Sequence, residues 1–483
     1  MSIYLAIDLG TTGCRSILFD SQLNEIAESY QEYGLIIKQD KWVEQDAMLW
    51  WTLTLQTAKE AIAKAGADGT EIKGISVSSQ GITVVPVDKC LNPLHNALSW
   101  LDVRAGSQAE QIKKDFGLRE MFTLTGKPID AAYSLPKLLW LKEELPKVYE
   151  QTWKFLMPMD FLVAKLTGKC VTDHSMASGT LMYDIKNKVW SRKVLDRYGI
   201  SEDRLPELKW SGEPAGKLLP EVAKELGLSE ECIVAVGAQD QRCASLGVGL
   251  KKGVVTLSLG TAAAVCKYQD EPKTDGDTRI GWSAYVNEGS WVTEGVINTA
   301  GTSLRWLRDT MYPGCGYDII NEEAKEALER GSNLLFYPYL NGASSPDRYV
   351  DSEGCFYGAN LGTQRGDFAL AVMESMAFQT KIILEAMGGL EDIHTLVLFG
   401  GGAKSPLWHQ IFADVLDMQI TFPISAEAAA AGAAILAGIA TGEYSRACNP
   451  ASEYKKVYGP SDKKELYRQK YERYRSIEYK LWR

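Results

Sequence analysis

Short apolar runs alternate with amphipathic segments along the first half of the chain. Residues 3–9 and 15–19 are apolar runs of strand length, and a Gly-Thr-Thr-Gly turn separates them. Residues 72–88 have the same organisation, with a turn at Gly81 between two strand-like runs. After Asp46, a suitable N-cap residue, apolar positions recur at helical spacing. This alternation predicts an α/β fold.

Four later segments add helices to this pattern, and two of them begin with a strand. Residues 136–152 are predicted to be helical, with a proline in the first turn. Residues 232–249 predict a strand, a glycine-bounded loop and a short helix. In residues 396–412 a strand enters three glycines, and the Ser-Pro pair at 405–406 predicts the start of a helix. Residues 463–483 predict a charged amphipathic helix that forms a solvated face.

An internal similarity divides the chain. LAIDLGTTGCRSILF (5–19) and VTLSLGTAAAVCKY (255–268) both predict a strand, a Leu-Gly-Thr turn and a second strand. They indicate two similarly built halves that meet at a cleft, although two unrelated hairpins with a common turn are the alternative. A chain of 483 residues is too long for one ordinary core. The glycines and lysines of GVGLKKG (247–253) favour a boundary there, so we predict domains at 1–247 and 248–483.

Composition narrows the functional classes. The chain is 45% hydrophobic and 24% charged, with a formal net charge of −10, which suits a soluble protein and argues against a nucleic-acid partner. Nine scattered cysteines contain no CxxC and no metal-ligand spacing, which predicts free thiols in a reducing compartment. The N-terminus has no basic start, and the small apolar tract at 428–440 is too short to span a bilayer. We therefore predict a cytoplasmic protein without a membrane partner.

The first hairpin concentrates the groups that a phosphate requires. The two glycines of its turn permit close backbone approach, and the hydroxyls of Thr11 and Thr12 can surround phosphate oxygens together with backbone N–H groups. Arg15 adds a permanently charged fork. Asp8 would repel a phosphate, but it fits the site if a Mg²⁺ ion lies between them. The pattern predicts a phosphate and metal site, and an ordinary turn with surface threonines is the alternative.

Two further glycine clusters are suited to other parts of a nucleotide. The second hairpin can cradle phosphate from the other side through Gly260 and Thr261. Gly401 and Gly402, ahead of the helix that Ser405 is predicted to cap, would let a base or a ribose pack against bare backbone. These clusters contain neither a GxxxxGK[ST] nor a GxGxxG motif, which excludes the P-loop and dinucleotide interpretations.

The general-base candidate is Asp240, which follows an apolar strand at the predicted domain junction. A carboxylate there can accept the proton of a substrate hydroxyl while that oxygen attacks a γ-phosphoryl group. The alternative is that Asp240 is only the N-cap of the following helix.

These residues resemble the FGGY family of carbohydrate kinases, which shares the actin, hexokinase and Hsp70-like nucleotide-binding fold. The resemblance covers nearly the whole chain and includes DLGTTGCR, WLDVRA, TGKPIDAAYSLPKLLWLKE, GAQDQ, LSLGTAA and LFGGGAKSPLW, in family order. It implies two ribonuclease-H-like domains that flank a nucleotide and sugar cleft, the first binding sugar and the second binding nucleotide. The implied activity is ATP- and Mg²⁺-dependent phosphorylation of a sugar or polyol hydroxyl. Homodimers, common in such kinases, are compatible with this chain.

The resemblance also implies roles for single residues. Asp8 matches the acid that helps to hold magnesium, and Asp240 matches the catalytic base, expected beside both the metal and the acceptor. Gln241 matches a polyol-binding glutamine of the glycerol kinases. Phosphate contacts are implied for Thr11, Thr12 and Arg15, and nucleotide contacts for Thr261, Gly301, Arg305 and Gly402. Arg305 departs from the glycerol kinases, which have Gln there, and Pro406 stands where they have an amide side chain.

The acceptor end matches no single member of the family. Xylulokinases carry Gln-Met-His-Gly and glycerol kinases Gln-Arg-Glu where this chain has Gln80, Gly81 and Ile82, which disfavours glycerol. Residues 165–184 are most similar to xylulokinases, so a pentulose such as xylulose is the predicted acceptor. Kinases of glycerol, a sugar acid or a signalling diol remain alternatives, as does a non-catalytic nucleotide-binding scaffold. Gln80, Asp102 and Arg104 are the predicted sugar contacts, unless the last two are surface charges.

Overall fold

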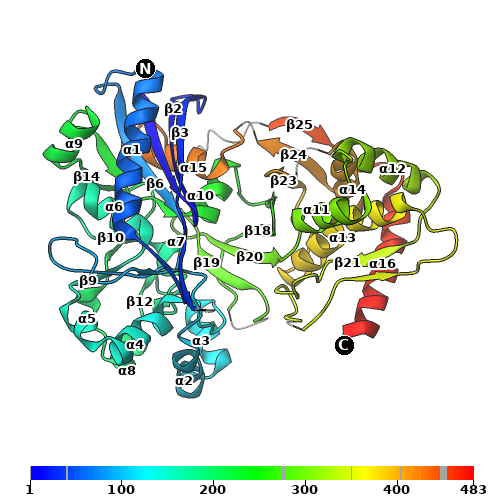
Figure 1. Ribbon diagram of the computed structural model, residues 1–483, viewed down its shortest axis with the longest axis horizontal. Coiled ribbons are helices and arrows are strands. Elements are labelled where there is room, and N and C mark those ends of the chain that lie inside the picture. Colours follow the sequence, from blue (N-terminus) through cyan, green and yellow to red (C-terminus); the bar gives the residue numbers. More distant parts are fainter. Residues whose placement is uncertain are drawn as a thin grey trace.

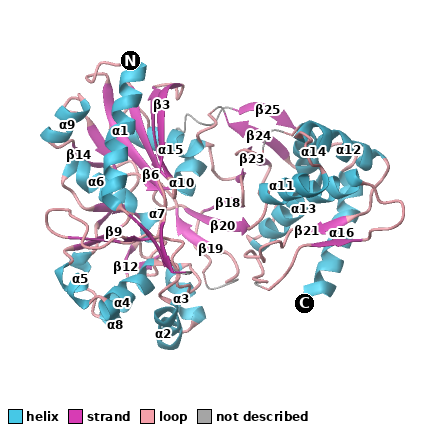
Figure 2. Cartoon of the chain, in the orientation of Figure 1, coloured by secondary structure: helices cyan, strands magenta, loops and turns pink. Residues whose placement is uncertain are grey.

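Two β-sheets form the centres of two lobes in the computed structural model (Figure 1). The structure describes residues 2–39, 42–274, 278–349, 351–402, 405–423, 425–446 and 454–482. Helices flank each sheet in the described ranges, as Figure 2 shows. The lobe built on the N-terminal sheet is called the first lobe here, and the lobe built on the other sheet is called the second lobe.

The first sheet has the order β14-β15-β6-β1-β2-β3, and β16 also pairs with β6. Neighbours β1, β2 and β3 are antiparallel, β6 is parallel to β1, and β15 is parallel to β6. The strands of this sheet are β1 (Ile3–Leu9), β2 (Gly13–Asp20), β3 (Glu25–Glu32), β6 (Ile72–Ser79), β14 (Pro214–Lys217), β15 (Ile233–Ala235) and β16 (Ala238–Gln239).

The second sheet repeats this arrangement with the order β19-β20-β18-β17-β23-β24-β25. Here β17, β18 and β20 are antiparallel neighbours, and β23 and β24 follow in parallel. The internal similarity in the sequence therefore reflects a real structural repeat. The strands of this sheet are β17 (Val254–Leu259), β18 (Ala263–Gln269), β19 (Gly281–Ala284), β20 (Trp291–Ile297), β23 (Thr395–Phe399), β24 (Gln419–Pro423) and β25 (Tyr454–Tyr458).

Short strands and helices complete the first lobe. The short strands there are β4 (Ile36–Gln39), β5 (Trp42–Gln45), β7 (Val85–Val87), β8 (Ala97–Leu98), β9 (Lys154–Leu156), β10 (Val171–Asp173), β11 (Tyr183–Asp184), β12 (Val189–Trp190) and β13 (Glu207–Lys209). Its helices are α1 (Ala47–Ala65), α2 (Gly106–Phe116), α3 (Leu118–Thr125), α4 (Ser134–Glu144), α5 (Pro146–Gln151), α6 (Pro158–Thr167), α7 (His174–Ala177), α8 (Arg192–Tyr198), the 3-10 helix η1 (Glu202–Arg204), α9 (Pro220–Leu226) and α10 (Asp240–Gly247).

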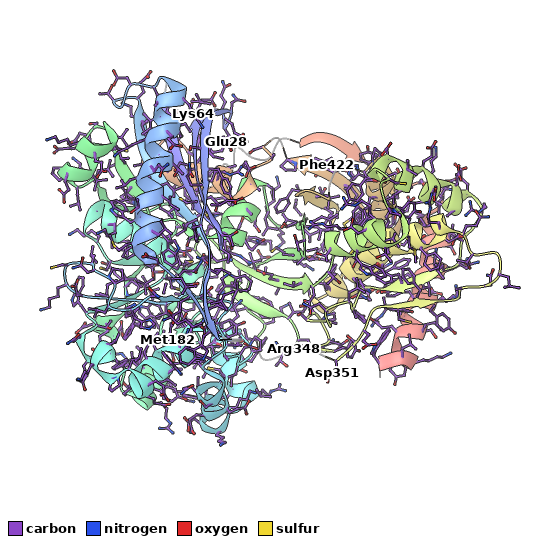
Figure 3. All side chains as sticks on the ribbon, in the orientation of Figure 1. Glu28, Lys64, Met182, Arg348, Asp351 and Phe422 are labelled. Carbon is purple, nitrogen blue, oxygen red and sulfur yellow. The ribbon has the colours of Figure 1, made fainter. Side chains whose placement is uncertain are left out.

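The C-terminal half supplies six further described helices and a small hairpin. They are α11 (Gly301–Met311), α12 (Tyr317–Glu329), α13 (Arg365–Ala386), α14 (Pro406–Leu416), α15 (Ala428–Ala440), α16 (Lys464–Trp482), β21 (Leu335–Tyr337) and β22 (Cys355–Tyr357). Helix α15, drawn in orange, lies beside the first sheet rather than the second, where it packs against α10, β1 and β6 (Figure 1). The lobes also meet where Arg348, labelled in Figure 3, pairs with Asp130 at 3.4 Å.

Local sequence signals are confirmed at several helix starts. Asp46 caps α1 by accepting hydrogen bonds from two backbone N–H groups, and Ser405 caps α14. The prediction of continuous helix through residues 136–152 is wrong, because Pro146 cannot continue α4 and instead begins α5. The prediction of a solvated face at residues 463–483 is wrong for one side of α16, which buries Tyr467 and Tyr474 in the second core.

Two other expectations concern the whole chain. The eight cysteines within the described ranges are all free thiols, as predicted; Cys448 lies outside them. Among the described residues, no helix combines the length and the apolar character needed to cross a membrane.

Candidate active site

The predicted magnesium ligand Asp8 and the predicted general base Asp240 come from parallel strands that end at the same edge of the first sheet. Asp8 on β1 is opposite Ser78 on β6, and Ser78 is in turn opposite Ala238 on β16. Asp240 begins α10 directly after β16. The register therefore brings Asp8 and Asp240 to one site, and the negative charge of Asp8 contributes to the raised pKa of Asp240.

The surroundings of Asp240 suit a general base. Burial, followed by the charge of Asp8, raises the pKa of Asp240 to about 7. Its Oδ1 accepts hydrogen bonds from the backbone N–H of Gln241 at 2.7 Å and from the side-chain amide of Gln239. Gln239 is the N-cap of α10, so Asp240 is the first helical residue rather than the cap. A carboxylate with a pKa near neutrality is well matched to proton abstraction at physiological pH.

Asp8 is held rigidly and carries little compensation for its charge. Ser78 donates a hydrogen bond of 2.8 Å to Oδ1, and burial raises the pKa of Asp8 to about 6. Two neighbouring carboxylates repel each other, and a divalent cation removes that repulsion. The described residues contain no group of three or more His, Cys, Asp or Glu side chains able to bind a metal. Mg²⁺ commonly uses one or two carboxylates with water and phosphate oxygens, so Asp8 and Asp240 fit this ion.

The turn between β1 and β2 is fixed by the first lobe. The indole N–H of Trp100 donates to Thr11 Oγ1 at 2.9 Å, and the amide of Gln45 donates to the Thr11 carbonyl at 2.8 Å. Thr12 is exposed at the tip of the turn. This arrangement anchors the turn from one side and leaves the Thr12 hydroxyl available.

Arg15 is committed to carboxylates in this structure. Its Nη1 lies 2.6 Å from Glu427 and 3.1 Å from Glu28, and its guanidinium lies over the ring of Tyr30. Glu427 immediately precedes α15, so this ion pair joins the C-terminal half to the first hairpin. Both ion pairs use Nη1, which is one of the three nitrogens of the guanidinium, and a phosphate contact by Arg15 stays a prediction.

A pocket of about 710 Å³ in the second lobe brings together the predicted nucleotide residues. Its lining includes every one of the predicted residues from this half of the chain, namely Gly260, Thr261, Gly301, Arg305, Gly401, Gly402 and Ser405. Five lining residues were not predicted, namely Leu304, Tyr317, Asp318, Asn321 and Trp408. Tyr317, Asp318 and Asn321 lie on α12, whose amphipathic pattern carries no turn or glycine signal.

Close backbone contacts shape this pocket. The N–H of Gly301 donates to the carbonyl of Gly260 at 2.9 Å, and a Cβ on Gly301 would lie 2.5 Å from that oxygen. The N-terminus of the 11-residue helix α11 is thereby fixed against the turn of the second hairpin. Ser405 donates to Asn321 Oδ1 at 2.5 Å, which joins α14 to α12 across the pocket. The free N–H groups of a helix N-terminus favour a negatively charged ligand, as a phosphate would be.

The predicted sugar contacts occupy a buried region behind the first hairpin. Gln80 is 2% exposed, and its amide donates to Gln45 Oε1 at 3.1 Å, while its own Oε1 has no partner among the described residues. Gln241 follows the base directly. Through Gln45, the contacts of Gln80 reach the turn that holds Thr11.

Asp102 and Arg104 form a buried ion pair, so their interpretation as surface charges is wrong. Arg104 pairs with Asp102 at 2.7 Å and with Glu44 at 3.0 Å, and its guanidinium lies over the rings of Trp42 and Trp140. Asp102 Oδ2 also accepts a hydrogen bond of 2.7 Å from a backbone N–H. The pair fixes the loop that carries Trp100, and sugar contact by either side chain stays a prediction.

The chain is similar to known proteins over nearly its whole length. The model of the FGGY family of carbohydrate kinases matches with its N-terminal domain at residues 3–247 and its C-terminal domain at residues 255–441. The chain is 32% identical over 445 residues to a xylulose kinase from Bacillus subtilis, covering 92% of this chain and 89% of that one. It is 32% identical over 483 residues to a glycerol kinase from Thermococcus onnurineus, covering 97% and 95%.

A solved structure shows the same architecture. Ligand-bound xylulose kinase from Lactobacillus acidophilus has a TM-score of 0.93 and 25% identity, over 100% of this chain and 98% of that one. The predicted two-domain α/β fold is confirmed. The chain therefore belongs to the FGGY family of carbohydrate kinases, which are ATP-dependent phosphotransferases with an alcohol group as acceptor.

Proposed function

We propose that this enzyme transfers the γ-phosphoryl group of Mg²⁺-bound ATP to a hydroxyl of a pentulose such as xylulose. The observation that carries the proposal is the meeting of Asp8 and Asp240 at one edge of the first sheet, with the pKa of Asp240 raised to about 7. The similarity to xylulose kinases over more than nine-tenths of the chain supports the acceptor class.

In this proposal each lobe supplies one part of the reaction. Residues 1–247 bind the acceptor and provide the base, and residues 248–483 bind the nucleotide in the pocket beside Gly260 and Gly301. Asp240 accepts the proton of the attacking hydroxyl as that oxygen bonds to the γ-phosphorus, and the bond from the γ-phosphorus to the bridging oxygen breaks to release ADP. Thr11 and Thr12 orient the phosphates. Mg²⁺, held by Asp8 and Asp240, would neutralise charge on the phosphates.

The proposed acceptor site contains a buried hydrogen-bond acceptor, Oε1 of Gln80, that a sugar hydroxyl can satisfy. The buried Oε1 of Gln80 accepts no hydrogen bond among the described residues, and a sugar hydroxyl is a natural donor for it. Gly81 and Ile82 provide neither the Arg-Glu pair of glycerol kinases nor the Met-His pair of xylulokinases. This favours a ketose larger than glycerol, recognised with fewer charged contacts.

We also propose that the enzyme works in the cytoplasm on a small-molecule substrate. Free thiols and a small-molecule substrate suit the cytoplasm, where ATP is available. We propose neither a nucleic-acid nor a membrane partner, because the net charge of −10 disfavours binding to polyanionic surfaces. A homodimer stays a prediction, which light scattering can check.

The test is acceptor-dependent ADP release with Mg²⁺ across pentuloses, hexuloses, polyols and sugar acids. We expect xylulose or a related pentulose to give the highest kcat/KM. Asp240→Asn serves as the inactive control, and Asp196→Asn, an exposed aspartate on α8, is the matched variant that should retain activity. A preference for glycerol or a sugar acid would contradict the acceptor assignment. ATP binding without ADP release from any acceptor would support a scaffold instead.

A further inference from the structure

Lys137 is a fully buried cation whose hydrogen-bond acceptors are all backbone carbonyls. It lies on α4 and is 0% exposed. Its Nζ donates to the carbonyl of Ser99 at 2.6 Å, to that of Ile82 at 3.4 Å, and to that of Ala132. Burying an ammonium group is costly unless its N–H groups are satisfied, and here three N–H groups match three carbonyls.

The three carbonyls belong to three separate loops, two of which carry the predicted sugar contacts Gln80, Asp102 and Arg104. Ile82 follows Gln80 on the loop after β6, where Gly81 lies against Gln239 beside the base. Ser99 immediately precedes Trp100, which binds the Thr11 hydroxyl. Ala132 lies on the loop that leads into α4. The Lys137 ammonium is therefore the common point of segments that are far apart in the sequence.

We propose that Lys137 is a positioning residue for the acceptor: its ammonium sets the spacing of these three loops and thereby the affinity for the sugar. The inference rests on the proposed function, because it concerns the same acceptor site. Without the ammonium, the Ala132 carbonyl loses this donor, while the Ile82 and Ser99 carbonyls keep only the Ser134 hydroxyl and the Asp102 N–H. The three loops are then no longer tied to one common group, so they separate or admit water. Small displacements of this kind are sufficient to weaken the positioning of a substrate.

The charge state of Lys137 makes this role sensitive to pH. Burial lowers the pKa of Lys137 to about 7, and the charged groups that face it are Asp102 and Arg104 after β8 and Asp130 before α4. The neutral amine has only two N–H groups, so one of the three bonds between Lys137 and the loops is lost when the proton leaves. KM for the acceptor should therefore rise as the pH increases through the neutral range.

The experiment compares Lys137→Met with Lys142→Met, a matched control on the same helix whose exposed Nζ binds one carbonyl. We expect Lys137→Met to raise KM for the acceptor roughly tenfold to a hundredfold, with KM for ATP changed less than about twofold. Between pH 6 and 9, the rise in acceptor KM should be present in the wild type and absent from Lys137→Met. Lys142→Met should match the wild type throughout.

Several results would overturn the inference. They are an unchanged acceptor KM in Lys137→Met, an equal rise in both KM values, or a pH profile that the substitution does not alter. If Lys137→Met failed to fold, Lys137→Gln would carry the same comparison, since it keeps two N–H donors without the charge. If the wild type phosphorylated no acceptor, the proposed function would fail separately. Amide hydrogen exchange in residues 80–84, 99–103 and 130–134 would then test the positioning role of Lys137. Faster exchange is expected in Lys137→Met than in the wild type, and equal exchange would refute the role.

Discussion

Replacing Asp240 by Asn should lower the rate of catalysis and, at alkaline pH, raise the stability of the fold. The variant keeps the size of the side chain and can still accept the hydrogen bond of 2.7 Å from the Gln241 N–H, but it cannot take a proton. Loss of a positioned general base typically costs roughly 10²–10⁴-fold in rate. We therefore expect kcat to fall by that factor while ATP still binds in the second lobe, since no residue of the nucleotide pocket changes.

The same substitution should stabilise the fold at alkaline pH. The pKa of Asp240 rises from 3.8 to about 7 on folding, which corresponds to at most ~4 kcal/mol of destabilisation above pH 7. Solvent reaches part of the side chain, so roughly 1–3 kcal/mol is the expected gain for Asp240→Asn at pH 8. The folded state binds the extra proton between pH 3.8 and 7, so wild-type stability falls as pH rises through that window. The advantage of the variant should consequently shrink at pH 5.

Three measurements check this prediction. Steady-state ADP release gives kcat, titration calorimetry gives ATP affinity, and urea unfolding at pH 5 and 8 gives the free energy of unfolding. The wild-type kcat at saturating acceptor, which a change in acceptor KM does not affect, should also increase with pH through about 7 as Asp240 loses its proton. Wild-type turnover in Asp240→Asn would show that another group is the base. A variant that is less stable than the wild type at pH 8 would refute the electrostatic reasoning.

Three further substitutions test the metal site, the nucleotide pocket and the contact between halves. Asp8→Asn should raise the Mg²⁺ concentration for half-maximal rate at least roughly tenfold in a metal titration, because outer-shell partners alone are worth about that much; an unchanged titration would contradict its role. Gly301→Ala places a Cβ 2.5 Å from the Gly260 carbonyl and should raise KM for ATP about tenfold with acceptor KM preserved, whereas Gly34→Ala, which meets nothing within 4 Å, should match the wild type. Gly432→Val puts a Cβ 1.9 Å from a backbone carbonyl of α10 and should lower the free energy of unfolding by about 3 kcal/mol in urea; equal stability would show that the helices can separate freely.

Local chemistry in the sequence was sufficient for much of the fold and of the candidate site. Glycine turns after apolar strands, the cap at Asp46 and the Ser-Pro helix start are encoded by neighbouring residues, so pattern alone locates them. Local pattern also located five of the predicted residues that line the second-lobe pocket, whereas Gly301 and Arg305 were implied by the family resemblance alone. The repeat of one hairpin indicated the repeat of a whole sheet, because a strand-turn-strand unit needs equivalent neighbours to bury its faces.

Contacts between distant segments could not be predicted in this way. Asp318 and Asn321 reach the pocket because α12 and α14 both pack against α13, and nothing in their local sequence distinguishes them from a solvated helix face. Glu427 pairs with Arg15 because α15, which follows strands of the second sheet in the sequence, packs on the first sheet. Lys137 appears in sequence as one more charged residue of an amphipathic helix, and only the converging loops reveal its environment.

The structural repeat also explains why the two hairpins differ in charge. Asp8 and Arg15 are paired across the first hairpin, whereas the equivalent positions of the second are Ser258 and Ala264. A second carboxylate beside Gly260 would repel the phosphates that this turn is proposed to hold, and no metal would be shared to compensate for it. Small neutral side chains leave the backbone N–H groups of that turn as the main donors. The same hairpin shape can therefore serve both proposed tasks, with metal binding and proton abstraction on the acid-bearing side and phosphate binding on both.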